Sequence, residues 1–144
     1  MRMKFYIGTD HAGFAIKHEV ITLLKARGCD VEDLGPFTDE RVDYPDFGHK
    51  VALAVLEDAG SFGLVICGTG IGISLAANKH KGIRAALCHD AYTAQMARAH
   101  NDANILAFGQ RIVGLGVIES MIDAFVSTPF EGERHALRVQ KIES

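Results

Sequence analysis

The chain has 144 residues, of which 48% are hydrophobic and 23% charged, the composition of one ordinary globular domain over residues 1–144. A formal net charge of −3 argues against general attraction to nucleic acid or to anionic membranes, so an anionic ligand needs a local cluster of arginines. We recognise no signal peptide and no membrane-spanning apolar run, and therefore expect a cytoplasmic protein. Its cysteines, Cys29, Cys67 and Cys88, are expected to stay reduced, and none has a second ligand at zinc-finger spacing.

Strand and helix patterns alternate along the chain. Short apolar stretches predict strands at Lys4–Gly8, Cys29–Leu34, Leu64–Cys67, Gly82–Cys88 and Ile105–Gly109. Apolar residues at helical spacing, and a charged tail, predict helices at Phe14–Arg27, Asp46–Ala59, Ile73–Lys79, Ala91–His100, Val113–Val126 and Glu131–Ser144. The alternation predicts a three-layer α/β/α sandwich with a five-stranded parallel, Rossmann-like sheet and a C-terminal tail helix.

Polar residues follow the first predicted strand and end the long loop of residues 35–45. Asp10 and His11 lie at a strand-to-helix turn, where Asp10 either caps the helix or serves a ligand site. The loop is longer than most connections, which is typical of segments that cover a substrate. Tyr44 at its end either reaches a pocket or packs beneath the loop.

The most informative stretch is the glycine turn after the third strand, with Gly68, Gly70 and Gly72. Such a turn before a helix directs several backbone N–H groups at one small oxygen, and Cys67 and Thr69 lie beside it. The dinucleotide fingerprint fits poorly because its third glycine is displaced, although Asp90 lies where a ribose-binding acid is expected. A simple helix–strand packing turn is the other interpretation.

Later residues supply further candidates at helix ends. His100 and Asn101 lie at the end of a predicted helix, where the positive charge of a histidine and a left-handed asparagine are both favourable. We also expect His100 to join Cys67 at the carboxyl ends of the strands. Arg111, Arg134 and Arg138 are either surface arginines or the local charge that holds a phosphate. A tail helix beyond the last strand also suits a site built from two subunits.

A thiol beside a group of backbone amides suits two reactions. One is nucleophilic attack with an oxyanion hole, and the other is proton abstraction next to a carbonyl, with the amides stabilising an enediolate. No serine–histidine–acid set and no obvious metal cage is present. These residues alone do not decide between the two reactions.

Six motifs together resemble one family along nearly the whole chain. They are Gly8–Phe14 (GTDHAGF), Asp43–Pro45 (DYP), Ile66–Ser74 (ICGTGIGIS), Ala76–Lys79 (AANK), His100–Asp102 (HND) and Glu131–His135 (EGERH). In this combination the chain closely resembles the type B ribose-5-phosphate isomerases, a family that also holds isomerases of galactose and allose 6-phosphates.

The resemblance implies interconversion of ribose 5-phosphate and ribulose 5-phosphate through a cis-enediolate, without a metal or other cofactor. Cys67 would move the proton between C1 and C2, and His100 would open the sugar ring, with Asp10 on the hydroxyl and Tyr44 nearby. The developing oxyanion would be held by Thr69 and by the backbone amides of Gly68, Thr69, Gly70, Ile71 and Gly72. The phosphate would be held by His11, Arg111, Arg134 and Arg138, and a sugar hydroxyl by Asn101.

Family members form homodimers, sometimes homotetramers, that share active-site residues between subunits, and they act in carbohydrate metabolism such as the pentose phosphate pathway. Some members use a glutamate base where this chain has Ile73, so the chain resembles the cysteine branch. Three alternatives stay open: an isomerase of a six-carbon sugar phosphate, a non-catalytic nucleotide-binding module, and a thiol redox sensor.

Overall fold

The computed structural model describes residues 2–144. Its centre is one parallel sheet of five strands, in the order β2 (Asp30–Asp33), β1 (Lys4–Thr9), β3 (Phe62–Cys67), β5 (Ile105–Gly109) and β4 (Ala85–Leu87). The predicted five-stranded parallel sheet is therefore confirmed, with β3 at its centre. The order of the last two strands is not the order in which they occur along the chain.

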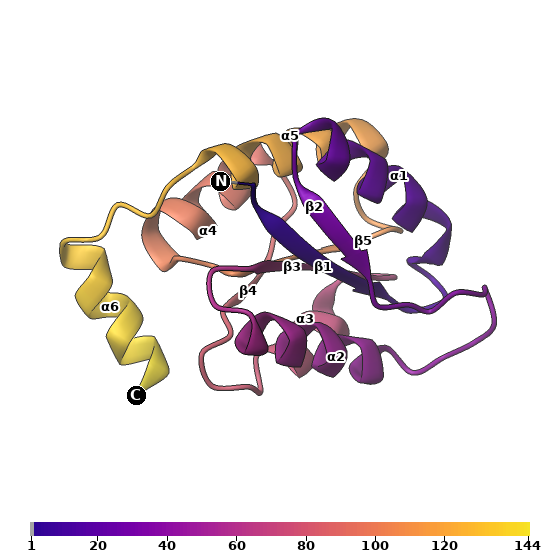
Figure 1. Ribbon diagram of the computed structural model, residues 1–144, viewed down its shortest axis with the longest axis horizontal. Coiled ribbons are helices and arrows are strands. Elements are labelled where there is room, and N and C mark those ends of the chain that lie inside the picture. The colour runs from indigo at the N-terminus through magenta and orange to yellow at the C-terminus, as the bar shows by residue number, and fades with distance from the viewer. Residues whose placement is uncertain (1) are drawn as a thin grey trace.

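Helices cover both faces of the sheet, as Figure 1 shows. One face carries α1 (Phe14–Ala26), α4 (Ala91–Asn101) and α5 (Leu115–Ser127), and the other carries α2 (Tyr44–Glu57) and α3 (Ile71–Ala77). The tail helix α6 (Arg134–Glu143) lies beside α4, away from the tips of the β1 and β2 arrows. The three-layer sandwich and the tail helix are both confirmed.

Alternating side chains of the buried strands form two separate cores. Along β3, Leu64 and Ile66 pack under α1, α4 and α5, whereas Val65 and Cys67 pack under α2 and α3. Both sets are almost fully buried because helices cover each face of a central parallel strand. Cys67 therefore faces the layer that contains α2 and α3.

Several boundaries differ from those expected. The helix α2 begins at Tyr44, with Pro45 in its first turn, because proline suits this position and its missing N–H has no intrahelical partner there. Strand β4 starts only at Ala85 because the side chain of Asn104 takes the backbone groups before it. Its Oδ1 accepts from the Arg84 N–H at 2.8 Å, and its Nδ2 donates to the Gly82 carbonyl at 2.9 Å.

No helix within residues 2–144 combines the length and the apolar character that a membrane crossing requires.

Candidate active site

The predicted site lies where the sheet changes its direction of winding. From β1 the chain moves to β2 on one side, and from β2 it returns past β1 to β3 on the other side. Ligands of open α/β sheets bind at this point, beyond the carboxyl ends of the strands. Asp10 follows β1 and Cys67 ends β3, and the Asp10 N–H donates to the Ile66 carbonyl at 3.2 Å. The two predicted residues are therefore neighbours.

The glycine turn wraps around the Cys67 thiol. The Gly70 N–H donates to Cys67 Sγ at 3.0 Å, and the Ile71 N–H donates to Thr69 Oγ1 at 3.2 Å. Gly70 has a φ of 81°, and a Cβ there would lie 2.6 Å from the carbonyl carbon of Phe108. Two of the amides expected to hold an oxyanion thus bond inside the turn. The other expected amides are those of Gly68, Thr69 and Gly72.

Two large side chains pack closely against the turn because its glycines have no side chains to keep them away. A Cβ on Gly68 would lie 3.1 Å from a terminal nitrogen of Arg111, and one on Gly72 would lie 2.3 Å from the Tyr44 ring. The Arg111 N–H also donates to the Gly68 carbonyl at 3.0 Å. Tyr44 therefore lies against the turn and is not packed beneath the loop. A phenol and a guanidinium thus flank the turn that carries Cys67.

Asp10 and His11 organise the rim of the site. Asp10 is buried, and its Oδ1 accepts from the Gly13 N–H at 3.0 Å, so it closes its own turn while the helix N-cap is Gly13. His11 Nδ1 accepts from the Val42 N–H at 3.2 Å, which ties the loop before α2 to the rim. Because Nδ1 is the acceptor, the proton of the neutral ring lies on Nε2.

The start of this loop is fixed by a residue that the sequence did not single out. Lys17 is almost fully buried on α1, and its Nζ pairs with Asp33 Oδ1 at 3.0 Å and donates to the Pro36 carbonyl. The lysine also lies over the rings of Phe14 and Phe37. A lysine on a helix usually indicates a solvent-exposed face, so no sequence signal distinguished this one.

His100 is not at the carboxyl ends of the strands, contrary to expectation. It lies in the last turn of α4, just before β5 begins at Ile105, whereas Cys67 pairs with Gly109 at the other end of β5. Four strand steps of about 3.3 Å put Cys67 about 13 Å along the sheet from Ile105. A helix between parallel strands runs back to the amino edge, and this connection carries His100 and Asn101 there.

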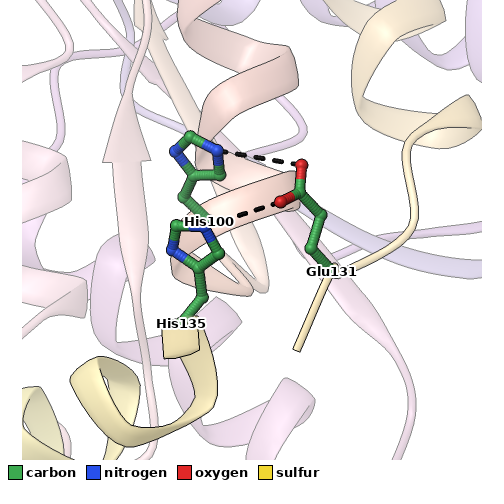
Figure 2. A group of neighbouring side chains, drawn as sticks. All are labelled: His100, Glu131 and His135. Carbon is green, nitrogen blue, oxygen red and sulfur yellow. Dashed lines mark ion pairs between the residues drawn. The ribbon is translucent and has the colours of Figure 1, made fainter. Parts of the chain in front are cut away.

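The tail brings further side chains to His100. The rings of His100 and His135 stack with centroids 4.1 Å apart and planes 9° apart, and both Nε2 atoms face the Glu131 carboxylate (Figure 2). Burial, followed by the positive charges of His100 and Arg134, lowers the pKa of His135 below its ordinary value. Arg138 contributes in the same direction, and both predicted tail arginines lie on α6 together with His135. Glu131 and His135 were not among the predicted site residues.

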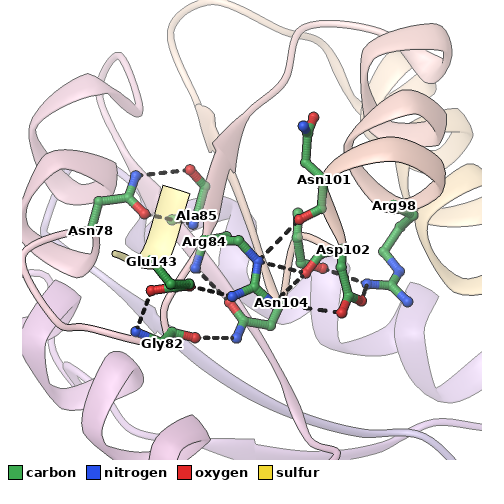
Figure 3. A network of polar contacts seen from close by, with 10 residues as sticks. Asn78, Gly82, Arg84, Ala85, Arg98, Asn101, Asp102, Asn104 and Glu143 are labelled. Carbon is green, nitrogen blue, oxygen red and sulfur yellow. Dashed lines mark hydrogen bonds and ion pairs between the residues drawn. The ribbon is translucent and has the colours of Figure 1, made fainter. Parts of the chain in front are cut away.

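A polar network holds this second group in place. Arg84 donates to the carbonyls of Asn101 at 3.0 Å and Asp102 at 2.9 Å, and it pairs with Glu143 near the end of α6 (Figure 3). The left-handed residue after α4 is Asp102, and Asn101 is the last helical residue. Arg84 thus links the end of α4 to the tail helix.

The structure also bears on two alternative functions. The Asp90 carboxylate accepts from the Thr93 N–H at 2.8 Å and caps α4, which explains this acid without a ribose. Cys29 and Cys88 belong to the core on the opposite face of the sheet from Cys67. Burial raises the pKa of both thiols, that of Cys88 to about 11. Neither is placed as a resolving partner for Cys67 in a redox sensor.

Comparisons with known proteins agree with this architecture. Residues 5–142 match the model of the family described as Ribose/Galactose Isomerase. The chain belongs to this family. It is 49% identical to the ribose-5-phosphate isomerase B of Escherichia coli over 139 residues, which cover 96% of this chain and 93% of the relative.

Solved structures of the family superpose on nearly the whole chain. The Clostridium thermocellum ribose-5-phosphate isomerase B has a TM-score of 0.95 at 54% identity, covering 98% of this chain and 95% of that one. The Trypanosoma brucei type B enzyme has a TM-score of 0.96 at 45% identity, covering 99% and 98%. The family expected from the motifs, its fold and its activity as a sugar-phosphate isomerase are thereby confirmed.

Proposed function

We propose that this protein interconverts ribose 5-phosphate and ribulose 5-phosphate, with Cys67 as the base and residues 1–144 as one catalytic domain. The observation that carries the proposal is the convergence of Asp10, Tyr44 and Arg111 on the turn around the Cys67 thiol. Relatives named ribose-5-phosphate isomerase B at 49% identity support the choice of substrate. The reaction we propose uses no metal or cofactor.

The carbon chemistry takes place beside Cys67. The thiolate removes the proton from C2 of the open-chain aldose, and the electrons of that bond form the C1–C2 double bond of a cis-enediolate. The hydroxyl of Thr69 and the amides of Gly68 and Gly72 stabilise the charge on oxygen. The thiol then returns the proton to C1, and the hydroxyl proton of O2 moves to O1, which gives the ketose. The Gly70 N–H, 3.0 Å from Sγ, fixes the base in place.

The remaining roles require a second subunit. The ring opens when His100 gives a proton to the ring oxygen and Asp10 takes the proton of the C1 hydroxyl, while Asn101 binds a sugar hydroxyl. His100 and Asn101 both lie near the amino edge of the sheet, remote from Cys67 of the same chain. A homodimer in which α4 and α6 of one subunit meet the glycine turn of the other would complete the site. A dimer of such dimers keeps the same sites. Arg134 and Arg138 then hold the phosphate opposite His11 and Arg111.

An activity assay tests the proposal directly. Purified protein in EDTA is given ribose 5-phosphate and, in parallel, allose 6-phosphate, and the ketose formed is measured. Fast turnover of the five-carbon sugar supports the proposal, including catalysis without added metal. Turnover of only the six-carbon sugar would keep the chemistry and change the substrate. Turnover of neither sugar would refute the catalytic function and favour a binding module.

Single-residue variants separate the base from the other thiols. Cys67→Ala is expected to abolish turnover while ribose 5-phosphate still binds, as measured by calorimetry. Cys88→Ala removes a thiol from the opposite core and serves as the matched control, with turnover retained. Near-normal turnover in Cys67→Ala would contradict the assignment of the base.

A further inference from the structure

We propose that His100, Glu131 and His135 form a binding site for one zinc-class divalent cation, which inhibits the enzyme when it is bound. The three residues come from the end of α4, from the segment before α6 and from the first turn of α6. Each offers one ligand atom, and all three atoms lie within 4.8 Å of one another. Within residues 2–144 this is the one group of three histidine, cysteine or acidic side chains gathered so closely.

The donor set and the closeness of its ligand atoms suit zinc. Zinc bound by two histidines and one carboxylate keeps a fourth position for water, and its ligand atoms lie about 3.3 Å apart at ordinary bond lengths. The Glu131 oxygens lie 3.8 Å from His100 Nε2 and 3.5 Å from His135 Nε2. Both distances are too long for good hydrogen bonds. The two imidazole planes are only 9° apart, so their in-plane lone pairs run parallel, and the half-exposed ring of His100 has to turn toward the ion when it binds. Imidazole nitrogens favour zinc over magnesium or calcium.

A second observation points to a missing ligand. His135 is 5% exposed, and its Nε2 atom is buried without a hydrogen-bond partner. Buried polar atoms of this kind are rare, and each needs an explanation such as an ion. Here the atom faces the carboxylate and the neighbouring imidazole, as Figure 2 shows. A cation between the three side chains would satisfy it.

The surroundings allow the ion to enter and limit its affinity. The side chains of His100 and Glu131 are 38% and 51% exposed in the single chain. In the proposed homodimer His100 lines the shared active site, which admits substrate and therefore also water and the ion. Arg134 and Arg138 add positive charge near His135, so binding is weaker than at a closed structural zinc site. This moderate affinity suits reversible inhibition.

Inhibition follows from the identity of one ligand and rests on the proposed function. The ion occupies Nε2 of His100, the residue proposed to open the sugar ring, and that nitrogen then no longer transfers a proton. Binding itself depends only on the three side chains. A failure of the catalytic proposal therefore leaves the binding site testable, and the two failures are distinguished by measuring binding and turnover separately.

The test is a calorimetric titration of the EDTA-treated and dialysed protein with zinc chloride. We expect one ion of moderate affinity for each chain, no comparable binding of magnesium, and affinity at least about tenfold weaker in Glu131→Gln and in His135→Gln. Glu131 is exposed, so its variant is expected to fold even where that of the buried His135 does not. His49→Gln is the matched control, because His49 and His80 form a separate pair without a third ligand and the ion should still bind.

Cobalt replaces zinc to identify the ligands. Ligation by two histidines and a carboxylate gives visible bands without the intense near-ultraviolet charge-transfer band of a thiolate. Absence of binding, unchanged affinity in Glu131→Gln, or a thiolate band would each overturn the site. In the isomerase assay, zinc is expected to inhibit the wild type and to inhibit Glu131→Gln at least about tenfold less potently, each relative to its own metal-free rate. Equal inhibition of both would overturn the inhibitory role.

Discussion

Replacement of Gly70 by alanine tests whether the turn around Cys67 depends on close packing. The residue has a left-handed φ of 81°, and an added Cβ would lie 2.6 Å from the carbonyl carbon of Phe108 and 2.7 Å from Cδ1 of Leu87. A left-handed alanine costs about 1–2 kcal/mol, and overpacking adds about 1–3 kcal/mol. We therefore expect the free energy of unfolding to fall by about 2–5 kcal/mol, a large part of the stability of an ordinary domain.

A matched control separates the two contributions. Gly28 has a φ of 80° after α1, and nothing lies within 4 Å of its added Cβ, so Gly28→Ala incurs only the backbone cost. Urea unfolding of both variants measures the difference, which we expect to be about 1–3 kcal/mol. Equal losses of stability in the two variants would refute the packing argument, because the strained backbone alone would then explain the effect.

Three further predictions concern the tail and the phosphate. Arg138→Ala should raise KM for ribose 5-phosphate about ten- to a hundredfold through the loss of a charged hydrogen bond, and an unchanged KM in steady-state assays would contradict this role. Burial lowers the pKa of His135 in the folded chain below the ordinary 6.5 of the unfolded chain. As the pH falls, the unfolded chain therefore binds a proton at this histidine before the folded chain does, and the free energy of unfolding decreases. His135→Gln should flatten the decline of the free energy of unfolding between about pH 7.5 and about pH 5, and an unchanged slope argues against it. Arg84→Met should free α6, seen as faster hydrogen exchange of that helix, and unaltered exchange would exclude Arg84 as the link.

The carboxyl-edge part of the site could be predicted from the sequence because two simple rules apply. Short apolar stretches locate parallel strands, and the carboxyl ends of such strands meet at one edge of the sheet. Cys67 ends one predicted strand and Asp10 follows another, so both residues belong at that edge. Tyr44 needed the structure, because a helix start at this residue, and not at Asp46, brings its ring against Gly72.

The second group of residues shows where sequence patterns are insufficient. A helix between two parallel strands must end at the amino edge, so the strand pattern already contained the reason why His100 lies away from Cys67. The contact of His100 with His135 depends on how the tail folds back onto α4, and no local periodicity encodes that. The exchange of β4 and β5 in the sheet likewise depends on tertiary packing and not on local pattern.

The most direct test of the shared site is a heterodimer of two inactive chains. Cys67→Ala and His100→Ala chains with different tags are coexpressed, and the mixed dimer is isolated by successive affinity steps. If each site takes Cys67 from one subunit and His100 from the other, one of the two sites is intact, and activity per dimer is about half that of the wild type. A mixed dimer as inactive as both parent homodimers would contradict the shared site.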